Sequence, residues 1–207
     1  VDAVQLIAVS KTKPLDNIKE AYKCGQLHFG ENRAKELEDK MENFEKEDIQ
    51  WHMIGALQTN KIKYMVNRVN WIDSVPKKKT LKEIEKRASR IGRSINTLIQ
   101  VNISGESQKS GCEPEDLAQI IDYARPLKHT KVRGLMGMAT FTENKQIIRD
   151  EFKRLKDLFE QFKPKNEGAV QLEELSMGMT NDMEIAIEEG STIVRVGRAI
   201  FGERDYN

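Results

Sequence analysis

The sequence predicts an α/β protein, a single-domain (β/α)₈ barrel of the TIM type. Short apolar runs alternate with amphipathic helical patterns along all 207 residues, and the connections between them are short. Such strict alternation requires parallel strands with right-handed crossovers, and eight repeats favour closure of the sheet into a barrel. An open doubly wound sheet is the alternative, but its usual Gly-rich first turn is missing after Ser10.

The expected strands are short runs rich in β-branched residues, which are typical of strands buried on both faces. They span residues 5–10, 27–30, 49–55, 71–75, 97–103, 132–138, 172–178 and 192–197. In a barrel of this type the residues just past each strand converge at one rim, where the chemistry is assembled.

The stretches between these strands carry apolar residues three and four positions apart, the spacing of a helix with one buried face. The helical patterns cover residues 18–22, 37–44, 62–69, 81–91, 117–124, 148–162 and 183–187. Because no linker, low-complexity tract or charge block separates them, we expect one domain over residues 1–207.

Composition narrows the functional classes. Lys and Arg number 34 against 33 acidic residues, a formal net charge of +1, so we expect neither nucleic acid nor an anionic membrane as a partner. No apolar run approaches membrane-spanning length, and the first residues lack the layout of a signal peptide. Cys24 and Cys112 match no metal or redox spacing, which favours the reducing cytoplasm.

Lys11 is the first candidate functional residue. It follows the first strand directly, and Pro14 suits the first turn of the helix that comes next. An ammonium at this rim is partly desolvated and crowded by backbone dipoles, conditions that free a lysine amine for Schiff-base formation. The alternative is an ordinary surface lysine.

The end of the chain supplies a second candidate site. Barrels of this type often bind phosphate at the loops after strands seven and eight and at a helix N-terminus. Ser176 could donate its hydroxyl there, and the backbone N–H groups of Gly197 and Arg198 could point at phosphate oxygens. The alternative interpretation makes the glycines of this region ordinary turn residues.

Arg195 shares a strand face with Gly197, because the two residues are two positions apart. If that face is the barrel interior, the guanidinium needs a partner. A ligand ring nitrogen, a ligand carboxylate or a structural salt bridge would each serve. An amine, a phosphate cradle and an interior arginine together favour an aldehyde phosphate, and pyridoxal 5′-phosphate (PLP) fits this description. For His28 and His52 we expect packing or hydrogen bonds, since neither has a second metal ligand at a suitable spacing.

Several strings in the sequence carry a family resemblance. In chain order they are AVSKTKP, FGEN, WHMIGALQTNK, QVNIS with KSG, GLMGM, and LSMGMTNDMEIAIEEGSTIVRVGRAIFG, and they span nearly the whole chain. In these strings the sequence resembles the PLP homeostasis protein family. That family is similar in barrel fold to the N-terminal domain of bacterial alanine racemase and to eukaryotic ornithine decarboxylase, the fold-type III arrangement.

The resemblance implies a role for each candidate. Lys11 would hold PLP as a Schiff base, Asn32 of FGEN would lie beside the ring, and Arg195 would meet the pyridine nitrogen. The phosphate would be bound by Ser176, Gly197 and Arg198.

Two features depart from the family pattern. Position 198 is often a small hydroxyl residue in the family, so Arg198 leaves its backbone N–H as the expected phosphate contact. Family members usually carry a further helix before the first strand, whereas this sequence begins almost at that strand. Either that helix was removed or disordered, or the amino-terminal end of the barrel is less covered.

The expected chemistry is binding without turnover. An arginine stays charged and keeps the pyridine nitrogen unprotonated, which weakens the cofactor as an electron sink. Racemisation would need a second acid–base residue on the far face of the ring. In alanine racemase this second residue is a tyrosine, which comes from an additional β-domain of the partner subunit. Nothing in the sequence identifies such a residue among Tyr22, Tyr64, Tyr123 and Tyr206.

The resemblance therefore implies a cytoplasmic protein of vitamin B6 homeostasis that buffers or delivers PLP, with PLP-dependent apo-enzymes as candidate recipients. We expect a monomer, with a dimer as the alternative. Two other functions remain open at this stage. One is a weak PLP-dependent amino-acid racemase. The other is a lysine-dependent aldolase of sugar phosphates, whose lysine usually lies on a later strand.

Overall fold

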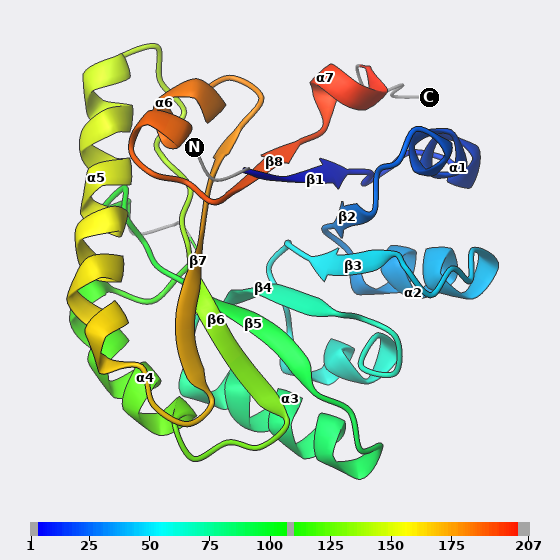
Figure 1. The fold of residues 1–207 in the computed structure, drawn as a ribbon, viewed down its shortest axis with the longest axis horizontal. Helices are drawn as coiled ribbons and strands as arrows, with labels where there is room; N and C mark the ends of the chain where they lie inside the picture. Colours follow the sequence, from blue (N-terminus) through cyan, green and yellow to red (C-terminus); the bar gives the residue numbers. More distant parts are fainter. Residues whose placement is uncertain (1–3, 107–109, 203–207) are drawn as a thin grey trace.

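The computed structural model, which describes residues 4–106 and 110–202, is a closed barrel of parallel strands with helices around its outside (Figure 1). The strands follow one another around the barrel in chain order, and β8 pairs with β1 to close it. The (β/α)₈ barrel predicted from the sequence is therefore confirmed, and the open sheet is excluded.

All eight predicted strands are present, and their ends differ from the prediction by a few residues. Their bounds are β1 Gln5–Val9, β2 His28–Glu31, β3 Gln50–Met53, β4 Trp71–Val75, β5 Ile95–Gln100, β6 Thr130–Met136, β7 Val170–Met179 and β8 Ile193–Val196. The difference that matters is at β7, which continues to Met179, so Ser176 lies within the strand instead of after it.

The helices α1 to α7 follow the strands. They span Leu15–Lys23, Ala34–Asn43, Lys78–Arg90, Leu117–Ala124, Lys145–Phe162, Met183–Glu188 and Arg198–Phe201. Three short 3₁₀ helices, η1 to η3, cover Thr59–Tyr64, Pro114–Asp116 and Lys163–Lys165. Among the described helices, none combines the length and the apolar character needed to cross a membrane.

The α-helix expected over residues 62–69 is wrong in type. The apolar side chains there are buried as predicted, but the backbone forms the 3₁₀ helix η1 followed by turns. The carbonyl oxygen of Ile62 accepts from Met65 N–H, three residues on, as in a 3₁₀ helix. It also accepts from Val66 N–H, four residues on, as in an α-helix. Apolar residues spaced by three and by four can be buried by either kind of turn, so the pattern alone does not separate the two.

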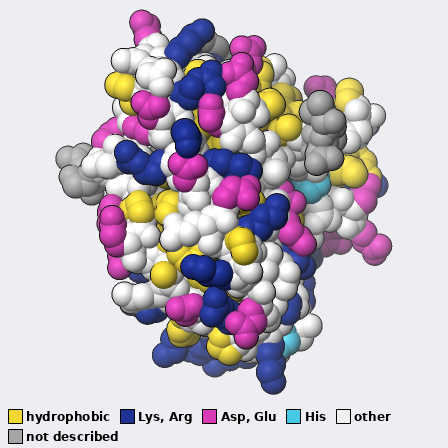
Figure 2. All heavy atoms as spheres, turned by 60° about the vertical axis from the view of Figure 1, so that its left-hand side comes forward, with side chains coloured by type: hydrophobic (Ala, Val, Ile, Leu, Met, Phe, Trp, Pro, Cys, Tyr) yellow, Lys and Arg dark blue, Asp and Glu magenta, His cyan; other side chains and the backbone are white. Residues whose placement is uncertain are grey.

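The apolar core has two parts. A small cluster fills the barrel interior, because its residues come from strands on opposite walls of the barrel: Ile7, Leu98, Met136 and Ile193. A much larger cluster lies between the strands and the helices. The long helix α5 contributes Phe152 and other buried residues to it, while its outer surface carries interspersed Lys, Arg, Asp and Glu side chains (Figure 2).

This layering predicts that replacing two phenylalanines by alanine lowers the free energy of unfolding by different amounts. Phe152 is fully buried, so Phe152→Ala leaves a cavity and should lower the free energy of unfolding by about 3–5 kcal/mol. Phe141 is 90% exposed, so Phe141→Ala should change it by less than about 0.5 kcal/mol. Urea denaturation of both variants checks the prediction, and equal effects would contradict the placement of α5 on the barrel.

Candidate functional site

The six candidate residues come together on four neighbouring strands. They follow or belong to β7, β8, β1 and β2, which are consecutive around the closed barrel. Five lie at or just past the carboxyl ends of β8, β1 and β2, and Ser176 lies near the end of β7: Lys11, Asn32, Ser176, Arg195, Gly197 and Arg198. Since parallel strands end at one rim, the structure places these residues on a single arc of that rim.

Strands β1 and β8 are in direct contact at this arc. Ile7 pairs with Arg195 in the parallel ladder between β1 and β8. A Cβ added at Gly197 would lie 3.1 Å from the carbonyl oxygen of Val9, so the glycine allows a close approach of the two backbones. The turn that carries Lys11 therefore lies beside the turn that carries Gly197, rather than on the opposite side of the ring.

Arg195 points into the barrel and is only 4% exposed. Its Nη1 donates to Ser176 Oγ at 2.6 Å, and its Nη2 donates to the carbonyl oxygen of Gly137 at 3.0 Å. Burial lowers the pKa of Arg195, while the charges of Asp73 and Asp182 act in the opposite direction. Among the described residues, no carboxylate forms an ion pair with this guanidinium, so the salt bridge considered as an alternative is not observed.

Ser176 has a partner that the sequence did not indicate. Its hydroxyl is fully buried and accepts the hydrogen bond from Arg195. A hydroxyl has one donor and two acceptor sites, so this bond leaves the Ser176 proton able to bind an anion. The residue thus links the interior arginine to the predicted phosphate site.

Gly197 and Arg198 begin the short helix α7, as the sequence predicted. Gly197 is the N-cap residue, and its carbonyl oxygen accepts from Ile200 N–H and Phe201 N–H. The first N–H groups of a helix have no acceptor within the helix. The side chain of Arg198 is exposed, so the backbone is the part of this residue that is built into the arc.

The turn that carries Lys11 is held from behind by helix α2. Lys11 is half-buried, and both of its neighbours are hydrogen-bonded to α2. Lys40 Nζ donates to the carbonyl oxygen of Ser10 at 2.8 Å, and Thr12 N–H donates to Glu36 Oε1 at 2.6 Å. Thr12 has a φ of +63°, a left-handed conformation that these bonds stabilise.

The same network contains a buried carboxylate, Glu31, at the end of β2. Glu31 Oε1 accepts from Lys40 Nζ at 2.7 Å and from Ser10 Oγ at 2.5 Å, while Oε2 is buried without a hydrogen-bond partner. Burial raises the pKa of Glu31 to about 7, against the lowering effects of Lys40 and Ser10. The sequence analysis missed this network, although Glu36 and Lys40 stand at the i,i+4 spacing of a helical ion pair.

Asn32 is half-buried and lies directly after β2. A Cβ added at Gly55 would come within 2.2 Å of the Asn32 carbonyl oxygen, so only glycine fits beside this backbone. Gly55 is held in turn by Ser74, whose hydroxyl donates to its carbonyl oxygen at 2.5 Å. The backbone of Asn32 is thereby fixed against the turn after β3.

His28 and His52 form hydrogen bonds, as the sequence analysis expected. His28 Nδ1 and His52 Nε2 are 3.0 Å apart, and His52 Nδ1 is 3.0 Å from Asp73 Oδ2. Asp73, which the sequence analysis did not single out, is fully buried. Within residues 4–106 and 110–202, no group of three or more His, Cys, Asp or Glu side chains could hold a metal ion.

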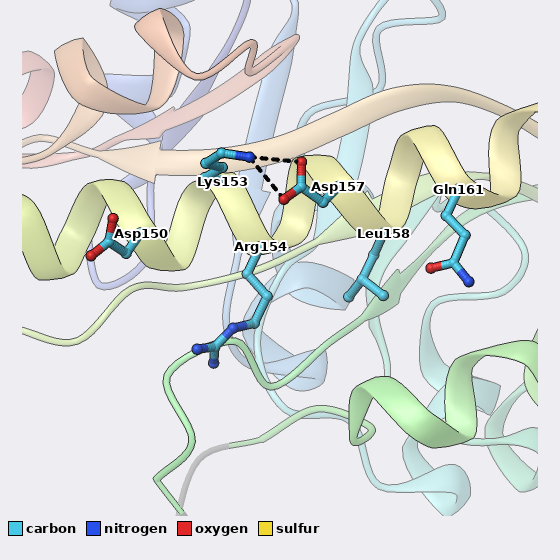
Figure 3. Close-up of a pocket in the computed structure, with 6 residues that line it drawn as sticks. All are labelled: Asp150, Lys153, Arg154, Asp157, Leu158 and Gln161. Atoms are coloured by element: carbon cyan, nitrogen blue, oxygen red, sulfur yellow. Dashed lines mark hydrogen bonds and ion pairs between the residues drawn. The ribbon is translucent and has the colours of Figure 1, made fainter.

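Two surface hollows lie outside this arc. One, of about 380 Å³, runs along the outer face of α5, where Lys153 pairs with Asp157 and the side chain of Arg154 donates to Ile103 O (Figure 3). The other, of about 800 Å³, is lined by residues 12–14 of the turn after Lys11, by Leu15 of α1 and mainly by residues of α2, including Glu36 and Lys40. None of the six candidate residues lines either hollow.

The donor set of the arc fits PLP. The arc contains the charged guanidinium of Arg195, whose hydrogen bonds go to neutral oxygens, and the hydroxyl of Ser176. It also contains the start of helix α7 at Gly197, and the turn that carries Lys11 follows the neighbouring strand. These groups are able to bind an anion that also carries an aldehyde. The KSG string begins at Lys109, which lies outside the described residues, as does Tyr206.

The chain is similar to known proteins over nearly its whole length. Residues 2–205 match the family described as alanine racemase, N-terminal domain. A pyridoxal phosphate homeostasis protein of Aquifex aeolicus is 43% identical over 205 residues, which are 99% of this chain and 89% of that protein.

Solved structures show the same fold. PipY of Synechococcus elongatus, in a structure with PLP bound, is 34% identical with a TM-score of 0.89, covering 98% of this chain and 94% of PipY. An alanine racemase of Clostridium difficile is 12% identical with a TM-score of 0.84, covering all of this chain and 57% of the racemase, a likeness of fold alone.

The raised pKa of Glu31 predicts a pH-dependent term in stability. Because folding raises this pKa from its ordinary 4.5 to about 7, the contribution of Glu31 is full below about pH 4.5 and is lost as the pH rises through 7. The free energy of unfolding of Glu31→Gln, minus that of the unmodified protein, should therefore rise by about 3 kcal/mol between pH 4.5 and pH 8.

Urea denaturation across this pH range measures the difference. Glu42→Gln, at an exposed position of α2, is the matched control and should show no such trend. A difference that does not change with pH would mean that Glu31 is not buried as a titrating group.

Proposed function

This chain belongs to the pyridoxal phosphate homeostasis protein family, and from that premise we propose that it binds PLP reversibly on Lys11 in intracellular vitamin B6 homeostasis. The single observation that carries the proposal is the pairing of β1 with β8, which brings the turn that carries Lys11 beside the turn after the buried Arg195. PLP supplies an aldehyde that a primary amine can capture and a phosphate that the rim can bind.

In this proposal each residue of the arc has one task. The Lys11 amine would hold PLP covalently through the aldehyde that the cofactor supplies, and water would be released. The phosphate is held by the Ser176 hydroxyl and by the backbone N–H groups of Gly197 and Arg198. Arg195 donates to the pyridine nitrogen, and Asn32 packs beside the ring.

We propose that the bound cofactor is stored and not turned over. Arg195 remains charged, so it donates a hydrogen bond to a ring nitrogen without giving up its proton, and the ring remains a weak electron sink. The described tyrosines belong to the helical layer: Tyr22 lies in α1, Tyr64 ends η1, and Tyr123 lies in α4. None of these lies on the strand rim, where an acid–base partner for racemisation would be needed.

The cellular role follows the same premise. We propose that the protein buffers PLP in the cytoplasm and releases it to PLP-dependent apo-enzymes. A reducing compartment suits Cys24, which is exposed, and Cys112, which is buried, since both are free thiols. We propose that the protein acts as a monomer, with a dimer as the alternative.

The Lys11 assignment predicts a spectroscopic loss. Lys11→Ala should abolish the visible absorbance that PLP acquires on bonding to the protein, because no amine remains at this position. The variant should still unfold at the same temperature without ligand, since Lys11 is only half-buried. Lys23→Ala, an exposed lysine at the end of α1, should keep the absorbance. A Lys11→Ala protein with undiminished visible absorbance would refute the assignment.

The Arg195 assignment predicts weaker binding of PLP while the covalent bond to Lys11 still forms. Arg195→Gln keeps neutral donors for Ser176 and Gly137 but removes the interior charge. PLP should then bind about tenfold more weakly, the effect of one lost charge-assisted hydrogen bond, while saturated protein still shows the visible band. Titration followed by absorbance measures both quantities. Unchanged affinity would show that the guanidinium does not meet the ligand.

A further inference from the structure

The tight turn that follows β1 has a conformation that is unusual for its sequence. Lys13 N–H donates to the carbonyl oxygen of Ser10 at 3.0 Å, so residues 10–13 form a β-turn with Thr12 at its third position. Thr12 has a φ of +63°, and turns with a positive φ at this position ordinarily carry glycine or asparagine there. A β-branched residue in this conformation is strained, so the turn needs support from the surrounding structure.

Lys40 supplies that support on one side of Lys11. A lysine ammonium has three N–H donors, and the structure gives each of them an acceptor. Nζ lies 2.8 Å from Ser10 O, 2.7 Å from Glu31 Oε1 and 2.7 Å from Glu36 Oε1. Lys40 is only 8% exposed and Glu31 is fully buried, so the network is largely shielded from water. Lys40 is therefore held in place by all of its donors.

Glu36 supplies the support on the other side of Lys11. Its Oε1, which accepts from Lys40, also accepts from Thr12 N–H at 2.6 Å. This one oxygen joins the lysine that holds the residue before Lys11 to the amide of the residue after it. Since Glu36 and Lys40 both belong to α2, a single helix holds the turn through two bonds.

These two bonds act on the two peptide groups that flank Lys11. The Ser10 carbonyl belongs to the peptide group before Lys11, and the Thr12 N–H belongs to the peptide group after it. Because peptide groups are planar, φ and ψ are the only soft dihedral angles of the Lys11 backbone. Fixing both peptide groups therefore fixes the direction in which the Lys11 side chain leaves the backbone.

We propose that Glu36 and Lys40 are positioning residues, which hold the Lys11 backbone in the conformation from which its amine captures the aldehyde of PLP. The inference rests on the proposed binding of PLP. A turn that adopts the competent conformation only part of the time binds more weakly in proportion to that fraction. The proposed contacts to the phosphate and the pyridine nitrogen come from β7, β8 and α7, so α2 should affect capture of the aldehyde and leave those contacts unchanged.

The test compares two ligands on Glu36→Ala. Pyridoxine 5′-phosphate has the ring and the phosphate of PLP but an alcohol in place of the aldehyde, so it cannot bond to an amine. Loss of the bond to Thr12 should weaken PLP binding about tenfold, the effect of a competent fraction reduced to about one tenth, and should leave pyridoxine 5′-phosphate binding within about twofold. Absorbance titration measures the first ligand, and isothermal titration calorimetry measures the second.

Two further variants of α2 are the controls. The amide oxygen of Glu36→Gln can still accept from Thr12 N–H, so this conservative variant should bind PLP within about threefold of the unmodified protein. Glu42→Ala, at an exposed position of the same helix, is the matched control and should change the affinity for neither ligand. Without ligand, the Thr12 amide hydrogen should exchange with solvent faster in Glu36→Ala than in Glu36→Gln, as measured by NMR.

A double variant tests the bond on the other side of Lys11 and decides the question if Glu36→Ala does not fold. Lys40→Met removes the donor to Ser10, and Glu31→Gln in the same protein avoids leaving an unpaired carboxylate in the interior. This protein should also bind PLP about tenfold more weakly and pyridoxine 5′-phosphate as before.

The outcomes separate the two proposals. If the unmodified protein does not bind PLP through Lys11, the proposed function fails, and this inference fails with it. If it does, the inference alone is overturned when Glu36→Ala binds PLP unchanged, when it loses affinity for both ligands equally, or when Glu36→Gln is as weak as Glu36→Ala. A loss confined to PLP in Glu36→Ala, largely restored in Glu36→Gln, supports it.

Discussion

The buried positive charge of Arg195 is the constraint on which the site depends. A guanidinium inside a barrel is costly to desolvate, and here its hydrogen bonds go to a hydroxyl and a carbonyl oxygen rather than to a carboxylate. Such a group is poorly compensated by the chain alone and well suited to an anionic ligand. Closure of the barrel pairs Arg195 on β8 with Ile7 on β1, the strand that Lys11 follows, although β1 and β8 are far apart in the sequence.

The second requirement is a fixed amine. The residues on both sides of Lys11 are tied to helix α2 through Lys40 and Glu36, so the turn is held from outside the barrel while its lysine lies at the rim. The strands and the helices thus contribute differently to the site. The strands supply the groups that would bind the ligand, and the first helices hold the turn in its left-handed conformation. Precise placement of a reactive group by its surroundings is what a binding site of this kind needs.

Alternation of apolar runs and helical stripes was sufficient to predict the barrel and all eight strands, because each pattern reports which face of an element is buried. The pattern could not distinguish η1 from an α-helix. It also could not show that Ser176 bonds Arg195, that Glu31 meets Lys40, or that His52 bonds Asp73. Each of these contacts joins side chains from different elements, and their register is set by how strands align in three dimensions, which periodicity within one strand does not determine. Apart from Ser176, which lies within β7 instead of after it, the candidate residues are at the strand ends that the sequence predicted, whereas the bonds that hold them were not predictable.

The most direct measurement of the central claim is peptide mapping by mass spectrometry after borohydride reduction of the protein mixed with PLP. Reduction makes the bond between amine and ligand permanent. The account predicts one phosphopyridoxyl group per chain, on the peptide that contains Lys11. A label on another lysine, or no label on a protein shown to be folded, would contradict the account.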